Sequence, residues 1–501
     1  MSKHKTLGQV YTPNWVVLEI LDLVNYRTEK ILNSYILEPS CGDGAFLIEI
    51  VKRFIYEAKK QNLSDLEIKT GLEKYIYGIE LDKGEYLKCI NNLNDIVKSN
   101  INFDHLDWNI LNENTLHVFK NYLTVFDFIV GNPPYIRIHN LDFATRGLLK
   151  EHFQFSEGTI DIYLSFFEMS FHMIKPDGFI GFITPNSYLH NSSYSKFRAY
   201  LKDRKVVNTL IDFKANKIFK GFSTYTAISI FENNNTKESF VYKELIDGEM
   251  TKINDILYSA LNMKDWSFTN KANEDFLKGI QQNKNCFINE LFNVQYGFAT
   301  LRDKIFIGPI QEVDNSENLV LFNDHLMESV LLKTVIKGSK FKGEIEHTQK
   351  IIFPFKKKSD KYIVIPEDEM KSCYPNCYDY FLKNEDELRA RDLDKSALWY
   401  EYGRSQGVQT IHNEKIVLST LVNNNINYHR VSKDVLMYSG IFIVKKDPNT
   451  DWSVIEDVLK SDEFFQFVRL TGKDFSGGYK SITTKQIKEF KINYSNNGIV
   501  F

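Results

Sequence analysis

Short apolar runs and amphipathic stretches alternate along the first half of the chain, from Tyr35 to about Phe231. The apolar runs are rich in β-branched and aromatic residues, and the stretches between them repeat apolar residues at helical spacing. This alternation is typical of a parallel sheet whose crossover helices cover both faces. We therefore predict an α/β fold, with a doubly wound, seven-stranded Rossmann-like domain. The expected strands are Tyr35–Glu38, Tyr75–Glu80, Ile101–Phe103, Phe126–Val130, Phe179–Thr184, Val206–Asp212 and Tyr225–Phe231.

The alternation fades after a polar segment, Glu232–Lys237. This segment has almost no capacity to bury apolar surface, which favours a linker. We predict a first domain over residues 1–237 and a second over residues 238–501. The second half contains irregular strands, aromatic-rich loops and helical stretches such as Glu456–Val468, without a repeat period, which indicates a mixed α+β domain.

Composition narrows the class of protein but does not name its partner. The chain has 501 residues, more than one compact core usually holds, so its length also favours two domains. The 62 Lys and Arg residues nearly balance the 65 Asp and Glu residues, so net charge gives no global sign of nucleic-acid binding. There is no apolar run long enough to span a bilayer and no basic-then-apolar leader, so we expect a soluble, cytoplasmic protein without a membrane partner. The five cysteines are too scattered to predict a disulfide framework or a zinc site, and we expect no metal.

A glycine-containing turn, within Leu37–Leu47, follows the first expected strand and precedes an apolar helical pattern. Glycines at a helix N-terminus let the backbone approach a ligand closely, although such a turn alone equally suits an ordinary strand-to-helix connection. The second expected strand ends at Glu80, at the carboxyl edge of the sheet. A carboxylate there can accept hydrogen bonds from both hydroxyls of a ribose, and a solvated strand-end charge is the alternative.

A third acid, Asp107, is followed by Trp108 just past the third expected strand. The carboxylate could accept from an adenine amino group while the aromatic ring lies against the base, whereas taken alone the pair would be a turn. Together the three strand ends predict a pocket for an adenosine-containing cofactor.

The strongest signal is the buried strand Phe126–Val130, which runs through Gly131 into Asn132-Pro133-Pro134-Tyr135. Two consecutive prolines fix the backbone and remove two donors, so the Asn132 side-chain oxygen and the Pro133 carbonyl can converge on one amino group. The nitrogen of a nucleobase amino group or an amide is a poor nucleophile, because its lone pair is delocalised. Two acceptors that bind its hydrogens favour the pyramidal geometry in which this nitrogen can attack. Tyr135 would stack on the planar substrate.

The order of these motifs resembles that of the gamma-class amino methyltransferases, N6-adenine DNA methyltransferases of restriction-modification systems. It begins with Gly8–Pro13 and spans roughly the first half of the chain. The resemblance implies S-adenosylmethionine as cofactor, double-stranded DNA as partner, and a separate cognate restriction endonuclease as a candidate partner at the same site. It implies the catalytic set Asn132, Pro133, Pro134 and Tyr135, and the cofactor-binding set Tyr11, Thr12, Glu38, Ser40, Cys41, Gly42, Glu80, Leu81, Asp107, Trp108, Asn132, Pro134 and Phe166.

Within that set, the resemblance assigns Thr12, Glu38 and Ser40 to the methionine part or backbone of the cofactor, Glu80 to the ribose, and Asp107 with Trp108 to the adenine. Trp108 is a departure, because family members often carry a smaller residue or Phe there.

Two phenylalanines fit the same resemblance. Phe166 lies ten residues before Pro176, where the family has a phenylalanine that lines the cofactor pocket. Phe219 matches the aromatic residue that, with Tyr135, stacks on a base rotated out of the duplex, and Phe222 is its rival if the register slips. Both positions also suit ordinary core residues.

The C-terminal half is expected, from the resemblance, to be a DNA target-recognition domain. Its candidate DNA contacts are the lysine-rich segment Lys333–Lys361 and the loops Tyr296–Thr300, Trp399–Arg404 and Ser476–Lys480, because lysines suit phosphates and aromatic, Arg and Gly-rich loops can enter grooves. A solvated surface is the alternative for the lysines.

Other functions remain as alternatives. A protein-glutamine methyltransferase also carries Asn-Pro-Pro-Tyr but normally lacks Gly8–Pro13 and a large C-terminal domain, and an RNA adenine methyltransferase would act on structured RNA. We find no paired-acid and lysine cluster of a fused nuclease, and the residues before Gly8 are too few to form one. A non-catalytic DNA-binding module would have to keep the Asn132 loop without binding the cofactor.

Overall fold

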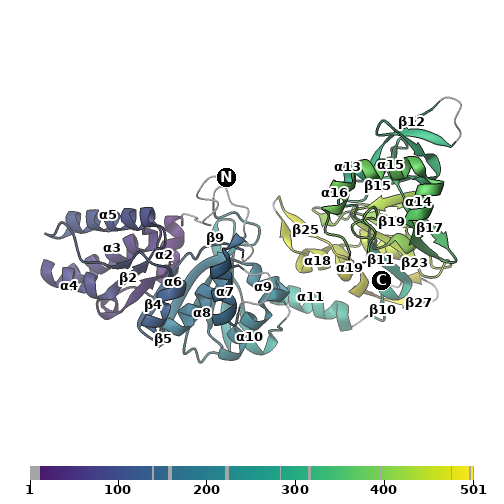
Figure 1. The fold of residues 1–501 in the computed structure, drawn as a ribbon. Coiled ribbons are helices and arrows are strands. Elements are labelled where there is room, and N and C mark those ends of the chain that lie inside the picture. Colours follow the sequence, from purple (N-terminus) through teal and green to yellow (C-terminus); the bar gives the residue numbers. More distant parts are fainter. Residues whose placement is uncertain are drawn as a thin grey trace. The chain divides into compact units, whose positions relative to one another are not determined.

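A computed structural model gives the structure of the chain, and it describes residues 12–137, 140–155, 161–219, 225–263, 265–282, 284–313, 318–394, 396–475, 477–495 and 498–499. The chain forms two compact units, Met1–Lys271 and Ala272–Phe501. Both units contain sheets and helices, as the sequence predicts (Figure 1).

Unit 1 is built on one mixed sheet with the strand order β3-β2-β1-β4-β5-β7-β6-β8-β9. β1 to β5 pair in parallel, whereas β7 lies antiparallel between β5 and β6. The strands are β1 Ile36–Glu38, β2 Ile76–Ile79, β3 Asn109–Leu111, β4 Phe126–Gly131, β5 Ile174–Pro185, β6 Val207–Asp212, β7 Thr226–Glu232, β8 Ser239–Ile246 and β9 Glu249–Leu257.

Helices cover both faces of this sheet, because neighbouring strand residues point to opposite sides. Ile36 packs in one apolar cluster with α2, α3 and α5, whereas Leu37 packs in a second with α8 and α10. The helices of unit 1 are α2 Asn14–Leu23, α3 Ala45–Lys60, α4 Asp65–Tyr75, α5 Lys83–Asn100, α6 Thr115–Val118, α7 Phe143–His152, α8 Tyr163–Met173, α9 Ser187–His190 and α10 Ser195–Arg204.

Two sequence predictions about this sheet are wrong. The third strand is Asn109–Leu111, because α5 extends to Asn100 and the expected strand Ile101–Phe103 lies in the turn that follows it. The expected linker Glu232–Lys237 is the connection from β7 to β8, and β8 pairs with β6 in the same sheet. The described sheet therefore has nine strands instead of seven, and unit 1 continues to Lys271.

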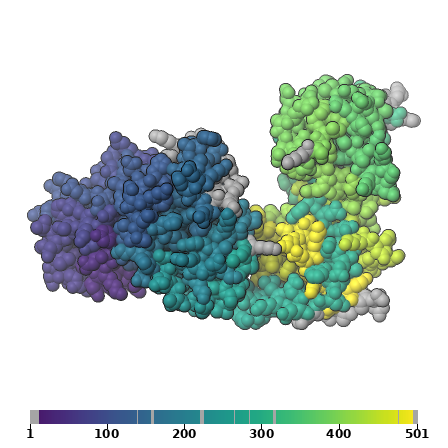
Figure 2. Space-filling model, turned by 60° about the horizontal axis from the view of Figure 1, so that its bottom comes forward, coloured from purple at the N-terminus to yellow at the C-terminus, as the bar shows by residue number. Residues whose placement is uncertain are grey.

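Unit 2 is a mixed α+β unit with several small sheets and two apolar clusters. Its larger sheets have the orders β14-β13-β12-β16-β15-β22 and β11-β23-β19-β21, so segments far apart in sequence lie side by side, as the teal, green and yellow surface patches show (Figure 2). The expected helix Glu456–Val468 is two helices, because Ser461 ends α17 and accepts the Phe464 N–H as the N-cap of α18.

The strands of unit 2 are β10 Cys286–Phe287, β11 Phe292–Tyr296, β12 Ile307–Glu312, β13 Leu319–Phe322, β14 His325–Glu328, β15 Leu332–Lys337, β16 Gln349–Ile352, β17 Phe355–Lys358, β18 Lys361–Val364, β19 Lys415–Leu418, β20 Leu421–Val422, β21 Tyr428–Val431, β22 Val435–Tyr438, β23 Ile441–Lys445, β24 Asp474–Phe475, β25 Tyr479–Ser481, β26 Lys491–Ile492, β27 Tyr494–Ser495 and β28 Gly498–Ile499. Its helices are α11 Lys271–Gln282, which begins at the last residue of unit 1, α12 Ile288–Leu291, α13 Asp303–Phe306, α14 Glu367–Cys373, α15 Pro375–Lys383, α16 Glu385–Arg389, α17 Ser453–Lys460, α18 Asp462–Thr471 and α19 Thr484–Glu489. Within the described ranges, no helix has both the length and the apolar character that a membrane span requires.

Candidate active site

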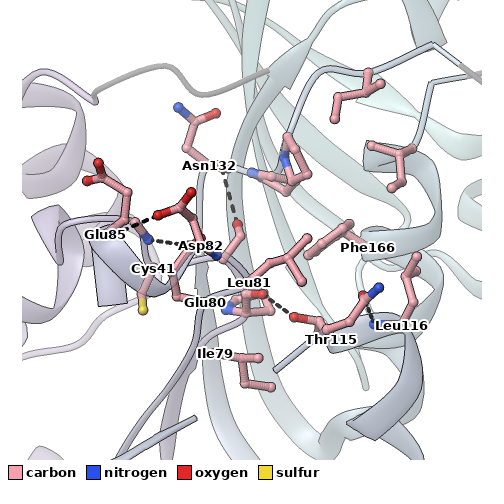
Figure 3. Close-up of a pocket in the computed structure, with 18 of the residues that line it drawn as sticks. Cys41, Ile79, Glu80, Leu81, Asp82, Glu85, Thr115, Leu116, Asn132 and Phe166 are labelled. Atoms are coloured by element: carbon pink, nitrogen blue, oxygen red, sulfur yellow. Dashed lines mark hydrogen bonds between the residues drawn. The ribbon is translucent and has the colours of Figure 1, made fainter. Parts of the chain in front are cut away.

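A cavity of about 440 Å³ lies in unit 1 at the carboxyl ends of β1, β2 and β4. Figure 3 shows side chains from well-separated segments around it: Cys41 from the turn after β1, Glu80, Leu81 and Asp82 after β2, Thr115 and Leu116 from α6, Asn132 after β4, and Phe166 from α8. The volume is in the range of sites for small-molecule cofactors.

The turn after β1 forms one wall and begins the helix α3. Gly42 and Gly44 have φ values of 53° and 92°, a left-handed conformation that glycine adopts without strain. A Cβ on Gly44 would also lie 2.8 Å from Cys89 Sγ, so a side chain at this position would be strained and would require its neighbours to shift. The Cys41 N–H donates to the carbonyl of Ile79 over 3.0 Å, which ties the turn to the end of β2.

Glu80 is held in place by the two segments that it joins. Its Oε2 accepts the Gly42 N–H at 2.8 Å and its Oε1 accepts the Asp82 N–H at 2.7 Å. Burial raises the pKa of Glu80, and these two hydrogen bonds partly offset that effect. Each carboxylate oxygen has two lone pairs, so each can accept a further hydrogen bond from a ligand in the cavity.

Glu38, the last residue of β1, also lines the cavity and is only 3% exposed. Burial raises its pKa well above the ordinary value, and its Oε2 has no hydrogen-bond partner among the described residues. An unpartnered buried carboxyl oxygen is costly, and a cationic ligand would satisfy it. The acids Glu38 and Glu80 thus fit a ligand that carries both an ammonium group and a ribose.

Asp107 and Trp108 do not line this cavity. They precede β3 instead of following it, so they lie toward the amino end of that strand, and the Trp108 ring nitrogen donates to Asn94 on α5. The residues that follow β3 line the cavity in their place, among them Asn114 and Thr115. Sequence reasoning missed these two, although an Asn before a short helix is a recognisable N-cap signal.

The Asn132 loop forms a second part of the cavity wall, next to the turn after β1. The Asn132 Nδ2 donates to Thr12 Oγ1 over 3.1 Å, and the Ser40 hydroxyl donates to the Asn132 carbonyl over 3.4 Å. Thr12, Ser40, Asn132, Pro133 and Pro134 all line the cavity. The structure thus brings these residues together from three separate segments of the chain. Tyr11, another expected contact, lies outside the described residues.

The two proposed base-stacking rings do not line the cavity, and they contact each other. The rings of Tyr135 and Phe219 meet edge to face, with their centroids 6.3 Å apart and their planes at 70°. The Tyr135 hydroxyl donates to the Ile183 carbonyl over 3.2 Å, and burial raises its pKa well above the ordinary value. A base stacked between two rings needs them nearly parallel and about 7 Å apart, so this pair is closed. Phe222, the rival of Phe219, lies outside the described residues.

The remaining wall comes from the connection between β4 and α8. Leu141, Asp142, Thr145 and Ile162 lie there, and Phe166 on α8 lines the cavity beside them. Asp142 is the N-cap of α7 and accepts the Thr145 N–H. Sequence reasoning found Phe166 and missed the rest of this wall.

The loops of unit 2 that were expected to contact DNA differ in exposure. Tyr400 and Tyr402 are fully buried and donate hydrogen bonds to the carbonyls of Ile365 and Ile352, so these two rings belong to the core. In the loop Tyr296–Thr300, Phe298 and Thr300 are likewise buried. Tyr479 is 43% exposed. Ser476 lies outside the described residues.

The lysine-rich segment includes the hairpin of β17 and β18. Lys357, Lys358 and Lys361 are exposed there, and no ion pair joins them to an acid within the described part of the chain. Lys358 pairs directly opposite Lys361 in the hairpin. Two like charges in this position repel each other, and a polyanion would relieve the repulsion.

Comparison with known proteins supports the expected class of protein. Residues 46–219 match the family described as Eco57I restriction-modification methylase. The chain is 26% identical to the type II restriction enzyme and methyltransferase RM.Eco57I of Escherichia coli, over 96% of this chain and 56% of that protein. It is 25% identical to the type II methyltransferase M.BstVI of Geobacillus stearothermophilus, over 86% of this chain and 80% of that protein. The chain therefore spans little more than half of the first relative, and the expected likeness to restriction-modification methyltransferases is confirmed.

Two solved structures share the fold along most of the chain. The type IIL restriction-modification enzyme MmeI, solved in complex with DNA, has a TM-score of 0.58 at 14% identity and covers 94% of this chain and 64% of its own. The DrdV–DNA complex has a TM-score of 0.54 at 12% identity and covers 98% of this chain and 56% of its own. At such identities the likeness describes the fold alone.

Proposed function

We propose that this chain transfers a methyl group from S-adenosylmethionine to the N6 amino group of an adenine in duplex DNA, at a specific sequence. The observation that carries the proposal is the convergence of the Asn132 loop with Glu38 and Glu80 on one cavity. Acceptors suited to an amino group thus lie beside carboxylates suited to an adenosine cofactor with an ammonium group. The likeness to restriction-modification methyltransferases supports the same chemistry.

The residues of the cavity fit the cofactor. Glu38 would accept from the ammonium group of its methionine part, and Glu80 from the ribose hydroxyls. Asn114 and Phe166 are candidates for the adenine, because they line the same cavity. When bound, S-adenosylmethionine supplies a methyl group on a positively charged sulfur that leaves as a neutral thioether.

Asn132 and Pro133 would make the target amine reactive. The hydrogen bond to Thr12 Oγ1 fixes Nδ2 as the donor end of the Asn132 amide, so Oδ1 lies on its other side. Oδ1 and the Pro133 carbonyl would each accept a hydrogen bond from one N–H group of the target amine. Together they would favour the pyramidal form of its nitrogen. Direct transfer then requires alignment and no covalent enzyme intermediate, and the extra proton passes from the methylated nitrogen to solvent.

An adenine inside a duplex cannot reach this cavity, so it must rotate out of the stack at a cost of a few kcal/mol. Tyr135 and Phe219 would offset that cost by stacking on the base, once their edge-to-face contact opens. The exposed lysines of the β17–β18 hairpin would contact DNA phosphates, which assigns unit 2 to DNA binding and target recognition.

The biological role proposed here is protection of host DNA from a cognate restriction endonuclease. The name of the Escherichia coli relative assigns both restriction and methylation to that one protein. For this chain we propose the methylation.

The direct test is methyl transfer from labelled S-adenosylmethionine to mixed-sequence duplex DNA, followed by nucleoside digestion and sequencing of the modified position. The proposal expects N6-methyladenine in one sequence context. Label on cytosine, RNA or protein instead would refute it. The full chain carrying Asn132→Ala is the control, because it should remove transfer and keep cofactor binding.

A further inference from the structure

Asp212 is a buried carboxylate at the carboxyl edge of the sheet, and the mechanism above does not use it. It is the last residue of β6 and is 1% exposed. Its Oδ1 accepts the Asn186 Nδ2–H at 2.9 Å and the Lys214 N–H at 2.9 Å, and its Oδ2 lies 3.3 Å from Lys214 Nζ. One carboxylate therefore joins the ends of two strands and the start of a loop.

The first of these connections leads to Tyr135. Asn186 follows Pro185, the last residue of β5. In the same strand, the carbonyl of Ile183, two residues before Pro185, accepts a hydrogen bond from the Tyr135 hydroxyl. The Asn186 N–H also donates to the Tyr225 carbonyl over 3.0 Å. The bond from Asn186 to Asp212 thus anchors the strand end that holds the Tyr135 ring.

The second connection leads to Phe219. The loop from Phe213 to Phe219 begins directly after Asp212, and Lys214 adopts a left-handed φ of 50° there. Asp212 holds this turn by accepting the Lys214 N–H, and Lys214 Nζ also lies 3.2 Å from Glu244 on β8. The direction in which the loop leaves the sheet therefore depends on the Asp212 carboxylate.

The carboxylate is charged at neutral pH despite its burial. Burial raises the pKa of Asp212, but Lys214 and the hydrogen bonds from Asn186 and the Lys214 N–H outweigh it and hold the pKa below the ordinary value. A buried charge of this kind contributes little net stability on average, and fixing one arrangement of its neighbours is its better attested use.

We propose that Asp212 is a positioning residue for base capture, which sets the spacing of the Tyr135 and Phe219 rings by tying the end of β5 to the loop that carries Phe219. The inference rests on the proposed function, because it assigns those two rings to the target adenine. Asp212 itself touches neither the cavity nor the substrate.

The test compares Asp212→Ala and Asn186→Ala with Asp127→Ala in the full chain. Asp127 is a matched control at the amino end of β4, where its carboxylate pairs with Lys175 over 2.8 Å and accepts the Tyr35 N–H. KM and kcat/KM are measured on the duplex sequence found to be methylated by the wild-type protein. A second duplex carries 2-aminopurine in place of the target adenine; it lacks the N6 amino group, so it serves only as a fluorescent reporter of rotation out of the stack.

Both test variants should raise the KM for DNA and lower kcat/KM by about tenfold to a hundredfold, because a hydrogen bond to a charged group is lost. They should also reduce the 2-aminopurine signal at saturating protein, while the affinity for S-adenosylmethionine stays within about twofold of wild type. Asp127→Ala should change none of these three readouts. If Asp212→Ala does not fold, Asn186→Ala decides, since it removes the same hydrogen bond from the half-buried partner.

Two outcomes separate the inference from the proposed function. A wild-type protein that methylates DNA, with both test variants matching Asp127→Ala in KM and fluorescence, overturns the role of Asp212 alone. A wild-type protein that transfers no methyl group to DNA overturns the proposed function, and the role of Asp212 falls with it.

Discussion

Replacing Glu38 with Gln should stabilise the protein without its cofactor and weaken cofactor binding at the same time. The Glu38 carboxyl group is buried at the end of β1, and its Oε2 has no hydrogen-bond partner among the described residues. Gln keeps the shape of the side chain and removes its titration. The two opposite effects follow from one cause, a carboxylate that is costly until a cation pairs with it.

The effect on stability depends on pH in a definite direction. Burial raises the pKa of Glu38 well above its ordinary value of 4.5. At pH values between the ordinary pKa, which applies to the unfolded state, and the raised pKa of the folded state, the folded state binds more protons than the unfolded state. The free energy of unfolding therefore decreases as pH rises through this range. The loss is complete above the raised pKa and amounts to about 1.36 kcal/mol for every unit by which the pKa is raised. The Glu38→Gln protein should lack this loss.

The effect on binding has the opposite sign. A cationic ammonium beside Glu38 favours the ionised carboxylate and lowers its pKa, so binding of S-adenosylmethionine below the raised pKa should release a proton. Loss of a charge-assisted hydrogen bond costs about 1.5–3 kcal/mol, which corresponds to an increase in Kd of about tenfold to a hundredfold in Glu38→Gln.

Calorimetry in buffers of different ionisation enthalpy measures the proton release, and chemical denaturation across pH measures the stability. Glu57→Gln is the matched control, because Glu57 is also a buried glutamate but lies on α3 outside the cavity. A binding enthalpy that is independent of buffer, together with an unchanged Kd for Glu38→Gln, would show that the cofactor's ammonium group does not sit beside Glu38.

Three further outcomes are expected. Asn132→Ala should lower kcat by at least about a hundredfold and leave the Kd for S-adenosylmethionine nearly unchanged in a binding titration, because its acceptor acts on the target amine; near-normal turnover would contradict this assignment. Gly44→Ala should lower the free energy of unfolding by about 1–3 kcal/mol in urea, since its φ is 92° and the new Cβ would lie 2.8 Å from Cys89 Sγ. Its matched control, Gly147→Ala in an open helical position, should not destabilise the protein. A fragment ending at Lys271 should fold and bind S-adenosylmethionine but lose sequence-specific DNA binding in a gel-shift assay, and retained specificity would contradict the role of unit 2.

The sheet could be predicted where strands carry nearly continuous apolar runs, as in Phe126–Val130 with Asp127 as its single polar residue, because burial on both faces requires such a run. The third strand, Asn109–Leu111, could not be placed because it is a short edge strand with only Ile110 fully buried. The more apolar Ile101–Phe103 was the better match to the pattern. The strand β8 was missed because it follows a polar segment that favours a linker, and only its first four residues alternate between half-buried and buried positions.

The site could be predicted where function depends on the ends of neighbouring strands. Glu38, Glu80 and Asn132 follow parallel strands, whose carboxyl ends meet at one edge of the sheet. The part of the cavity wall around Leu141 and Asp142 could not be predicted, because it depends on the path that the connection after β4 takes back to the cavity. Tyr400 and Tyr402 of unit 2 were assigned to a DNA-contacting loop for a different reason. An aromatic-rich segment of this composition suits a buried core as well as a loop that enters a DNA groove, and these two rings are buried.

The proposed cofactor side and the proposed base side of the site differ in how much rearrangement each would need before its ligand binds. The turn after β1 is fixed by backbone hydrogen bonds to Glu80 and Ile79, so the cofactor side needs little rearrangement. The base side is closed, because the Tyr135 and Phe219 rings contact each other edge to face. Under the proposed function, opening that contact would be a cost on the capture of the base, and the apparent affinity for DNA would fall in proportion to the fraction of molecules that are open. Changes that weaken the Tyr135–Phe219 contact and leave the Asp212 tie intact should therefore lower the KM for DNA, whereas loss of the Asp212 tie should raise it. In both cases the affinity for S-adenosylmethionine should stay the same, which makes the two sides separable by measurement.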